Sequence, residues 1–277
     1  MSAAGPPQGA NCAPAFGGSA AAELDNEAAS VGVHIATAPT LFISDLHLSP
    51  ERPALVAALH SLLRGSARGA AALYAIGDLF DAWFGDDQLR EPLAAGVAAA
   101  FAELSASGTP VYLQRGNRDF LIGERFAQAS AATLLADAVV HDVHGTPTLI
   151  MHGDQLCTDD AAYQRFRAWW QDPIHRRRFL ALPYFARRAV AAFLRTASRR
   201  AIAGKSPVIM DVNAEAVASA LREHRVTRLI HGHTHRPARH ELVVDGRTCE
   251  RYVLADWYTT GSYLRVDAEG CRAVSLA

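Results

Sequence analysis

The residues best suited to do chemistry lie in LIHGHTHRPARH, residues 229–240, where four histidines occupy twelve positions. An apolar core would have to desolvate each imidazole, so histidines at this density usually indicate metal binding or proton transfer. This stretch alone leaves a second interpretation open, in which a solvated loop is rich in histidine without any function. Motifs elsewhere in the chain must decide between the two.

Five short apolar runs of strand length each lead into polar residues that can bind a metal ion. The clusters that follow these runs are Ser44-Asp45-Leu46-His47, Gly77-Asp78 with Asp81, Gly116-Asn117-Arg118-Asp119, His152-Gly153-Asp154 and His231-Gly232-His233-Thr234-His235. Helical stretches rich in Ala and Leu separate several runs, notably at 52–64, 91–107 and 213–224. Because functional residues of open α/β sheets gather beyond the carboxyl ends of strands, the five clusters should converge on one edge.

Glycines accompany four of these clusters, namely Gly77, Gly116, Gly153 and Gly232. Glycine lacks Cβ and therefore permits a sharp turn or a close approach of the backbone to a neighbouring side chain. After Arg239 the pattern changes to short β runs with a hairpin signal at VVDGRT. We therefore expect antiparallel strands that complete a layered sandwich.

The ligand types of these clusters, carboxylate, carboxamide and imidazole without thiolate, favour hard or borderline divalent ions such as Mn²⁺, Fe²⁺ or Zn²⁺. The seven candidate ligands are Asp45, His47, Asp78, Asn117, His152, His233 and His235. Seven ligands exceed what a single ion would take, so two ions are expected, with one carboxylate bridging them. Paired ions clamp a phosphoryl group and lower the pKa of a bound water, which makes a nucleophile at neutral pH.

Composition limits the rest of the interpretation. With 277 residues, half of them apolar, the chain can bury one substantial core with an inserted subdomain. No stretch approaches the roughly 18 apolar residues of a spanning helix, so any membrane contact should be peripheral. Four scattered cysteines without a CxxC pair suit a reducing, cytoplasmic setting. Residues 1–38 are rich in Ala, Gly, Pro and Ser and lack a basic start, which predicts a disordered extension rather than a targeting peptide.

The blocks DLH, GDLFD, GNRD, HGD and GHTH, in this order over residues 45–235, resemble the signature of the calcineurin-like metallophosphoesterases. The variants GNRD, HGDQLCTDDAAYQ and HGHTHRPA resemble more narrowly the UDP-2,3-diacylglucosamine pyrophosphohydrolase family of lipid A biosynthesis, from Thr40 onward. This resemblance implies an α/β fold, an αββα sandwich with an inserted helical cap. The core would be 39–155 and 207–277, the lipid-binding cap 156–206, and the extension 1–38 has no counterpart in the family.

The resemblance also implies an activity, which is hydrolysis of the pyrophosphate bond of UDP-2,3-diacylglucosamine. Hydroxide would attack the alpha phosphorus, nearer uridine, and release UMP and 2,3-diacylglucosamine 1-phosphate. Two Mn²⁺ ions per chain are implied, with Asp78 as the bridging ligand. One ion would be held by Asp45, His47, Asp78 and His235, and the other by Asp78, Asn117, His152 and His233. We further expect a monomer in the cytoplasm, peripheral on the inner face of the inner membrane, that contacts anionic lipids and no nucleic acid.

Several residues are expected to contact the substrate. By resemblance, the contacts come from Asn117, Arg118, Asp160, Ser198, Lys205 and His233. Ile202 stands where the family commonly has Asn, which places one substrate hydrogen bond in question. Arg118 is expected to be catalytic together with Asn117, because a departing sugar phosphate is a weak base that needs charge stabilisation more than a proton. His231 and His240 are expected to be structural or to orient the ligands.

The segment from Thr158 to Ser206 is strongly basic, with eleven Arg or Lys against three Asp, a net charge of +8 in a chain of total charge −1. Aromatic and leucine side chains interleave with these arginines in what should be two or three helices. Such a segment could cap the core, hold acyl chains, and direct its cations to a pyrophosphate and to anionic lipids. The aromatic side chains could instead only pack the insertion itself.

Three other functions remain open from the sequence. A broad metallophosphoesterase for cyclic nucleotides or phosphoproteins would share the metals but has no use for an apolar, basic cap. A binding module on a degenerate phosphoesterase fold is opposed by the full ligand set. A nucleic-acid enzyme or binder is suggested by the arginines interleaved with aromatic residues.

Overall fold

The computed structural model describes residues 38–203 and 211–276, without the side chains of residues 195 and 197–203. The described elements all belong to one compact unit, Ala36–Ala277. Nearly all of the predicted extension, residues 1–37, lies outside the described residues. Among the described residues, no helix combines the length and the apolar character needed to cross a membrane.

Eleven strands and seven α-helices, with two short 3₁₀ helices, make up the described part of the chain. The strands are β1 (Thr40–Ile43), β2 (Ala72–Ile76), β3 (Val111–Gln114), β4 (Thr133–Leu134), β5 (Ala138–Val143), β6 (Thr146–Met151), β7 (Arg228–His231), β8 (Ala238–Val244), β9 (Arg247–Val253), β10 (Ser262–Asp267) and β11 (Gly270–Ser275). The helices are α1 (Pro53–Arg64), η1 (Asp86–Arg90), α2 (Pro92–Ala106), α3 (Glu124–Ala129), η2 (Asp154–Leu156), α4 (Ala161–Gln171), α5 (Pro173–Leu180), α6 (Tyr184–Ala203) and α7 (Ala214–His224).

The strands form two mixed sheets. The first has the order β11-β10-β1-β2-β3-β4, in which β1 to β4 are parallel and β10 is antiparallel to β1. The second has the order β5-β6-β7-β9-β8, with β6, β7 and β9 parallel. Every residue of β1 and β2 is buried, as expected for parallel strands that are covered on both faces.

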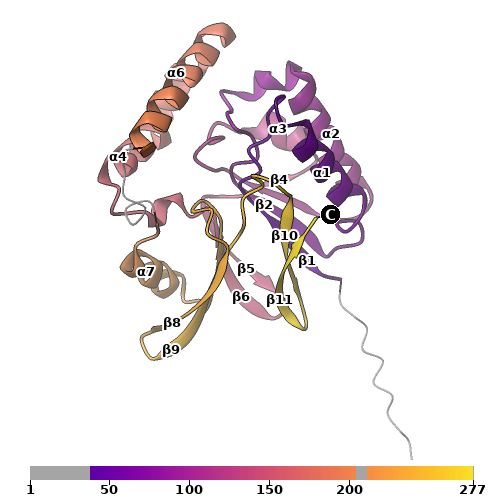
Figure 1. Ribbon diagram of the computed structural model, residues 1–277, viewed down its shortest axis with the longest axis vertical. Coiled ribbons are helices and arrows are strands. Elements are labelled where there is room, and N and C mark those ends of the chain that lie inside the picture. Colours follow the sequence, from indigo (N-terminus) through magenta and orange to yellow (C-terminus); the bar gives the residue numbers. More distant parts are fainter. Residues whose placement is uncertain (1–37, 204–210, 277) are drawn as a thin grey trace, which may run out of the picture. The chain divides into compact units, whose positions relative to one another are not determined.

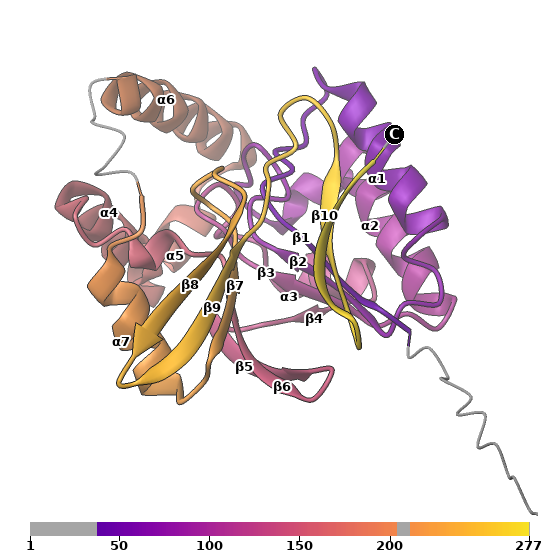
Figure 2. The ribbon, with the colours of Figure 1, turned by 60° about the horizontal axis from the view of Figure 1, so that its bottom comes forward.

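Helices cover the outer face of each sheet, so the core is a sandwich of four layers (Figures 1 and 2). Apolar side chains of α1, α2 and α3 pack on the first sheet, and those of α7 pack on the second. A third cluster fills the space between the sheets, where Tyr74 stacks between Phe42 and Tyr112 with ring centroids 4.7 Å apart on each side. The predicted αββα sandwich is therefore confirmed.

The C-terminal strands also follow the sequence prediction. β8 and β9 pair as an antiparallel hairpin in which Val244 lies opposite Arg247. Its two turn residues, Asp245 and Gly246, have φ values of 50° and 77°. Positive φ at both central positions is the geometry that a two-residue hairpin favours, because its twist matches that of the strands.

The insertion between η2 and α7 consists of α4, α5 and α6. It does not pack only on itself, because Trp170 of α4 and Phe179 of α5 belong to the apolar cluster of the first sheet. Arg187 of α6 is 5% exposed and donates to the carbonyl oxygen of Phe84 at 2.7 Å and of Leu182 at 3.0 Å. The insertion is thus fastened to the core by both apolar and charged side chains.

Candidate metal centre

The seven candidate ligands come together at one edge of the sandwich, beyond the carboxyl ends of five strands. Asp45 follows β1, Asp78 follows β2, Asn117 follows β3, His152 follows β6, and His233 follows β7. Ligand atoms of two groups lie within 4.8 Å of one another, Asp45 with His47 and His235, and Asp45 with Asp78 and His152. The predicted convergence of the polar clusters is therefore confirmed.

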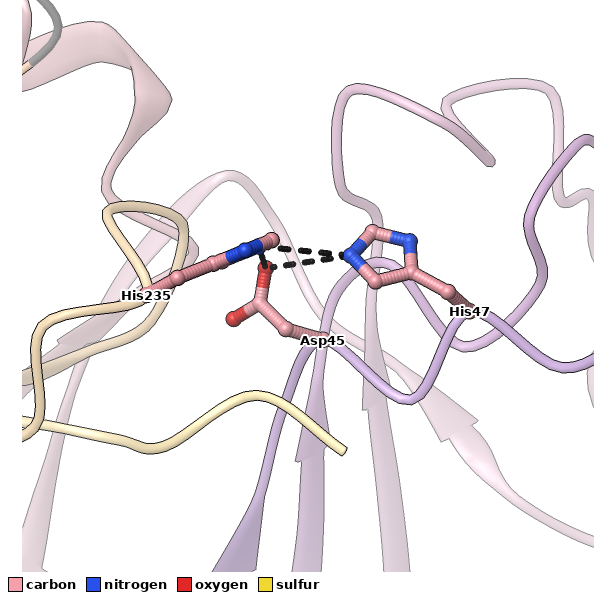
Figure 3. A group of neighbouring side chains, drawn as sticks. All are labelled: Asp45, His47 and His235. Atoms are coloured by element: carbon pink, nitrogen blue, oxygen red, sulfur yellow. Dashed lines mark hydrogen bonds and ion pairs between the residues drawn. The ribbon is translucent and has the colours of Figure 1, made fainter. Parts of the chain in front are cut away.

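One half of the centre is formed by Asp45, His47 and His235 (Figure 3). Nε2 of His235 lies 3.1 Å from Oδ1 of Asp45, and Nε2 of His47 lies 3.9 Å from the same oxygen. The two Nε2 atoms are 3.3 Å apart. Two imidazole nitrogens and a carboxylate oxygen thus point toward one small region.

The other half is formed by Asn117, His152 and His233. Oδ1 of Asn117 lies 3.1 Å from Nε2 of His152 and 2.9 Å from Nδ1 of His233. Asp78 stands between the halves, with Oδ1 3.7 Å from Nε2 of His152 and Oδ2 3.8 Å from Nε2 of His47. Asp78 therefore presents one oxygen to each half, which is the arrangement that a bridging ligand needs.

Hydrogen bonds behind the ligands orient them toward this point. Nδ1 of His152 donates to the carbonyl oxygen of Ile76 at 3.0 Å, which orients Nε2 toward the centre. Oδ2 of Asp45 accepts from Oγ of Ser44 at 2.7 Å and from the backbone N–H of His233 at 2.8 Å. The remaining oxygen of Asp45, Oδ1, is the one that faces the two histidines.

Buried Asp119 has a different role from the ligands. Its carboxylate accepts the backbone N–H groups of Leu79 and Gly116, each at 2.7 Å, and of Asp78 at 3.3 Å. These bonds join the loops that follow β2 and β3. Asp119 therefore holds Asp78 and Asn117 at a fixed separation without facing the centre itself.

The backbone of the centre is conformationally strained. Positive φ values, between 47° and 71°, are found at Asp45, His47, Asp78, His233 and His235. Residues other than glycine rarely adopt this left-handed backbone conformation. Nine described residues other than glycine have positive φ, and five of them are candidate ligands. Such strain persists where the surrounding structure enforces it and is frequent at functional sites.

Two of the glycines allow the close approach that the sequence suggested. A Cβ on Gly77 would lie 2.5 Å from Nδ1 of His152, and one on Gly232 would collide with Asp45 and Ser44. Any larger residue would therefore push a ligand out of place. The prediction that these glycines permit tight packing around the polar clusters is confirmed.

Burial and mutual charge shift the pKa values of the ligands in opposite directions. Burial lowers the pKa of His47 and of His233 to about 4 each, and burial together with Asp45 raises that of Asp78 to about 6. Burial opposes the charge on His152, yet Asp78 and Asp45 raise its pKa to about 9. For Asp45, the hydrogen bond from His235 and nearby imidazoles outweigh burial and lower the pKa.

These groups fit divalent cations. With Nδ1 of His152 donating to Ile76, its Nε2 faces the oxygen of Asn117. The Nε2 atoms of His47 and His235 face each other and Oδ1 of Asp45. A cation at these positions would take the place of the protons there, and the set of oxygen and nitrogen donors suits a hard or borderline ion.

The predicted substrate residues lie in different places. Arg118 donates its backbone N–H to Oδ1 of Asp78 at 2.8 Å, and its side chain lines an apolar pocket between the core and the insertion. Asp160 caps the N-terminus of α4 by accepting from the N–H of Tyr163 at 3.1 Å. The side chains of Ser198, Ile202 and Lys205 lie outside the described residues.

The two remaining histidines of the opening motif differ from the ligands. His231 is fully buried, and its Nδ1 donates to the carbonyl oxygen of Gly232 at 2.8 Å, so it supports the loop from behind. His240 is exposed on β8. A structural role, as expected from the sequence, agrees with the position of His231.

Sequence reasoning missed a polar network beside the centre. Asp154 accepts from the hydroxyl of Tyr163 at 2.5 Å and from Nε of Arg167 at 2.8 Å. The ring of Tyr163 stacks on that of His233 at a centroid distance of 6.1 Å. Asp154 and Tyr163 both lie in the block HGDQLCTDDAAYQ of the sequence, but their contact with each other and with Arg167 was not predicted.

Comparisons with known proteins show what the chain is similar to. Residues 38–237 match the family model for the calcineurin-like phosphoesterases. The UDP-2,3-diacylglucosamine hydrolase of Escherichia coli O81 (strain ED1a) is 53% identical over 230 residues, 83% of this chain and 95% of that protein. The protein of the same name from Shigella sonnei (strain Ss046) is 52% identical over the same shares. A solved archaeal phosphodiesterase aligns at 12% identity with a TM-score of 0.43, over 86% of this chain and 99% of that one.

Proposed function

The chain belongs to the calcineurin-like phosphoesterase family, and from this premise we propose that it hydrolyses UDP-2,3-diacylglucosamine at its pyrophosphate bond. The products would be UMP and 2,3-diacylglucosamine 1-phosphate. Support comes from relatives that carry the name UDP-2,3-diacylglucosamine hydrolase, are more than half identical and are matched over 95% of their length.

One observation carries the proposal, which is that the metal centre adjoins an apolar pocket. Asn117 and Arg118 line this pocket, and most of its other walls are aromatic or aliphatic. The core contributes Trp83, Phe84, Phe120 and Leu121, and the insertion contributes Phe166, Trp170, Phe179, Ala191 and Leu194. A substrate with a phosphoryl group beside acyl chains fits both surfaces at once, whereas a cyclic nucleotide or a phosphoprotein has no group for the apolar walls.

The chain's own residues have distinct tasks in this reaction. Asp45, His47, Asp78 and His235 would hold one divalent ion, and Asp78, Asn117, His152 and His233 the other. Ions at these positions would acidify water and neutralise phosphoryl charge. Hydroxide attacks the phosphorus nearer uridine, and the sugar phosphate leaves on the opposite side. Arg118, permanently charged and able to form two hydrogen bonds at once, stabilises that departing phosphate.

We propose Mn²⁺ as the ion, as the family resemblance implies. The donors are carboxylate, carboxamide and imidazole, with no thiolate among the ligands, and they suit Mn²⁺ as they suit Fe²⁺ and Zn²⁺. Mg²⁺, which prefers oxygen ligands, suits this mixture less well. The strained loops and buried hydrogen bonds around the ligands supply a preformed site.

The insertion, residues 156–206, acts as the lipid-binding cap and as the contact with the membrane. Phe185 and Phe193 of α6 are 76% and 71% exposed, and Trp169 of α4 is 48% exposed. Exposed aromatic side chains beside many arginines suit the interface of an anionic bilayer. We therefore place the enzyme in the cytoplasm, as a monomer bound peripherally to the inner face of the inner membrane.

A direct assay tests the proposal. Full-length protein is incubated with Mn²⁺ and UDP-2,3-diacylglucosamine, and UMP release is measured beside bis(4-nitrophenyl) phosphate and single-stranded nucleic acid as alternative substrates. We expect a strong preference for the lipid substrate and loss of activity on chelation. Equal turnover of the simple diester, or salt-dependent binding of nucleic acid without UMP release, would refute the substrate assignment.

A further inference from the structure

Two pockets, not one, adjoin Asn117. Besides Asn117, both are lined by the aromatic side chains Phe120, Tyr163, Phe166 and Trp170. The first pocket is the apolar one described above. The second is lined by Arg115, which directly follows β3, by Arg167 and Arg176 of the insertion, and by Asp137 and Asp154.

Among the described residues, one of these three arginines forms ion pairs with carboxylates. Arg167 forms ion pairs with Asp154 and with Asp137, each at 2.8 Å. Nε of Arg115 donates to the uncharged carbonyl oxygen of Ile122 at 2.6 Å. Within the part of the chain that the structure describes, neither Arg115 nor Arg176 has an ion pair.

Arg176 is more unusual, because its Nε is buried and has no hydrogen-bond partner among the described residues. A buried guanidinium N–H without an acceptor is costly and calls for an explanation. Burial, and then the charge of Arg176, lower the pKa of Arg115, so the two cations act on each other. With Asp137 and Asp154, the charged residues that line this pocket carry one net positive charge, and neither Arg115 nor Arg176 is ion-paired among the described residues.

From these contacts we propose that the second pocket is a binding subsite for a phosphate-class anion, held by Arg115 and Arg176 beside the metal centre. An anion there accepts hydrogen bonds from the unpaired guanidinium and separates the two like charges. The cavity of about 40 Å³ has room for an ion of a few heavy atoms.

Such an anion could come from two sources that share this chemistry. Because Gly116 and Asn117 also line the pocket, a phosphoryl group there would adjoin a second one at the metal centre. It could be the other phosphoryl group of a diphosphate substrate, in which case the inference rests on the proposed function. It could also be free inorganic phosphate, which requires no substrate at all.

Binding of inorganic phosphate to the metal-loaded, full-length protein tests the subsite. Titration calorimetry and melting temperature are measured in phosphate-free buffer for wild type, Arg115→Gln and Arg176→Gln. Arg178→Gln is the matched control, since it removes the same charge from the exposed side of the same helix. Phosphate bound at the metal centre is common to all four proteins and cancels in the comparison.

We expect Arg176→Gln and Arg115→Gln to weaken one class of phosphate binding by about 10-fold or more, the scale of a lost charge-assisted hydrogen bond. Arg178→Gln should bind as wild type does. Without phosphate, Arg176→Gln should melt at or above the wild-type temperature, because removing it relieves an unpaired cation. Unchanged phosphate binding in both variants, or a lower melting temperature of Arg176→Gln with unchanged binding, would overturn the proposal.

Steady-state kinetics on UDP-2,3-diacylglucosamine distinguish the two sources. If the pocket takes the substrate's second phosphoryl group, Arg176→Gln should raise KM by about 10-fold. If the pocket takes free phosphate, Arg176→Gln should keep the wild-type KM, and added phosphate should no longer change the rate of this variant. Should the protein fail to hydrolyse this substrate, the proposed function falls, whereas the phosphate titration still decides the subsite.

Discussion

The metal centre and the inserted helices differ in burial, in backbone conformation and in the side chains that they present. The centre is buried, built on strand ends, held in left-handed backbone conformations and supported by hydrogen bonds such as that from His152 to Ile76. The insertion exposes large apolar side chains, with Phe185 at 76%. Rigid strand ends can hold metal ligands in the geometry that catalysis needs. Helices on the outside of the core can present an apolar, positively charged surface.

Several arginine–carboxylate pairs join the two regions. Arg187 of α6 pairs with Asp87, and Arg167 of α4 pairs with Asp154 and Asp137. Apolar packing of Trp170 and Phe179 completes the joint. Substrate selection should therefore be separable from bond cleavage by substitution, and the following predictions test that separation.

The largest effect should come from Asp78→Ala, because one carboxylate faces both halves of the centre. We expect a loss of activity beyond the ~10²–10³-fold typical of one electrostatic group, on every substrate. Elemental analysis should show that both metal positions are depleted. A variant that keeps two metal ions per chain would exclude Asp78 as the bridge.

Arg118→Ala should lower kcat/KM on UDP-2,3-diacylglucosamine by about 10²–10³-fold, because the departing phosphate loses its charge stabilisation. Lys should restore part of the rate, since it carries the charge without the planar fork. An alkyl phosphodiester serves as the comparison substrate, with metal content measured for each variant. Equal losses on both substrates would mean that Arg118 acts only by supporting the metal site through Asn117.

Arg187→Met should separate the regions, because this side chain fastens α6 to the loop at Phe84. We expect kcat/KM on the acylated substrate to fall roughly 10-fold or more, the scale of a lost buried charged hydrogen bond, while a small phosphodiester is affected much less. The neighbouring, exposed Arg188→Met is the matched control. Parallel losses on both substrates would show that α6 and the centre are one unit.

A smaller effect is expected when Phe185 and Phe193 are both changed to Ser. Binding to vesicles of anionic lipid should weaken several-fold. Full transfer of one such side chain out of water contributes roughly 1.5–3 kcal/mol, and this is the upper bound on what each phenylalanine adds to the binding free energy. Hydrolysis of a water-soluble phosphodiester should persist at the wild-type rate. Sedimentation with vesicles measures binding, and neutral vesicles control for charge. Unchanged binding would move the membrane contact elsewhere.

The smallest effect concerns the ion pair between Asp87 and Arg187. The pKa of Asp87 lies below its usual value because the hydrogen bond and charge of Arg187 outweigh burial. A carboxylate with a lowered folded-state pKa stabilises the fold above its unfolded pKa, and this contribution disappears as pH falls through the folded value. Wild type should therefore melt a few degrees above Asp87→Asn at pH 7. The gap should close in acid, and a gap that is constant with pH would contradict the linkage.

Much of the fold was predictable from local pattern. The helices expected at 52–64, 91–107 and 213–224 are found at Pro53–Arg64, Pro92–Ala106 and Ala214–His224. Proline at the first turn, or Asn213 accepting from the N–H groups of Glu215 and Ala216, marks where each helix begins. These signals are local, so they can be read from neighbouring residues alone.

The composition of the metal centre was also predictable, and for a physical reason. Strands buried on both faces are continuous apolar runs, and parallel strands end at the same edge, so polar residues after such runs must meet. His233 and His235 illustrate this, because their separation by one residue after β7 places each imidazole in a different half of the centre.

Only the tertiary structure decided how the surroundings are arranged. The contact of Arg167 with Asp137 and Asp154 spans 30 and 13 residues, and that of Arg187 with Asp87 spans 100. Asp160 proved to cap α4, and two pockets with shared aromatic lining lie beside Asn117, one apolar and one lined by charged side chains. The position of a strand end can be predicted from the apolar run that precedes it. The spacing between an inserted helix and the core depends on tertiary packing, which no local pattern encodes.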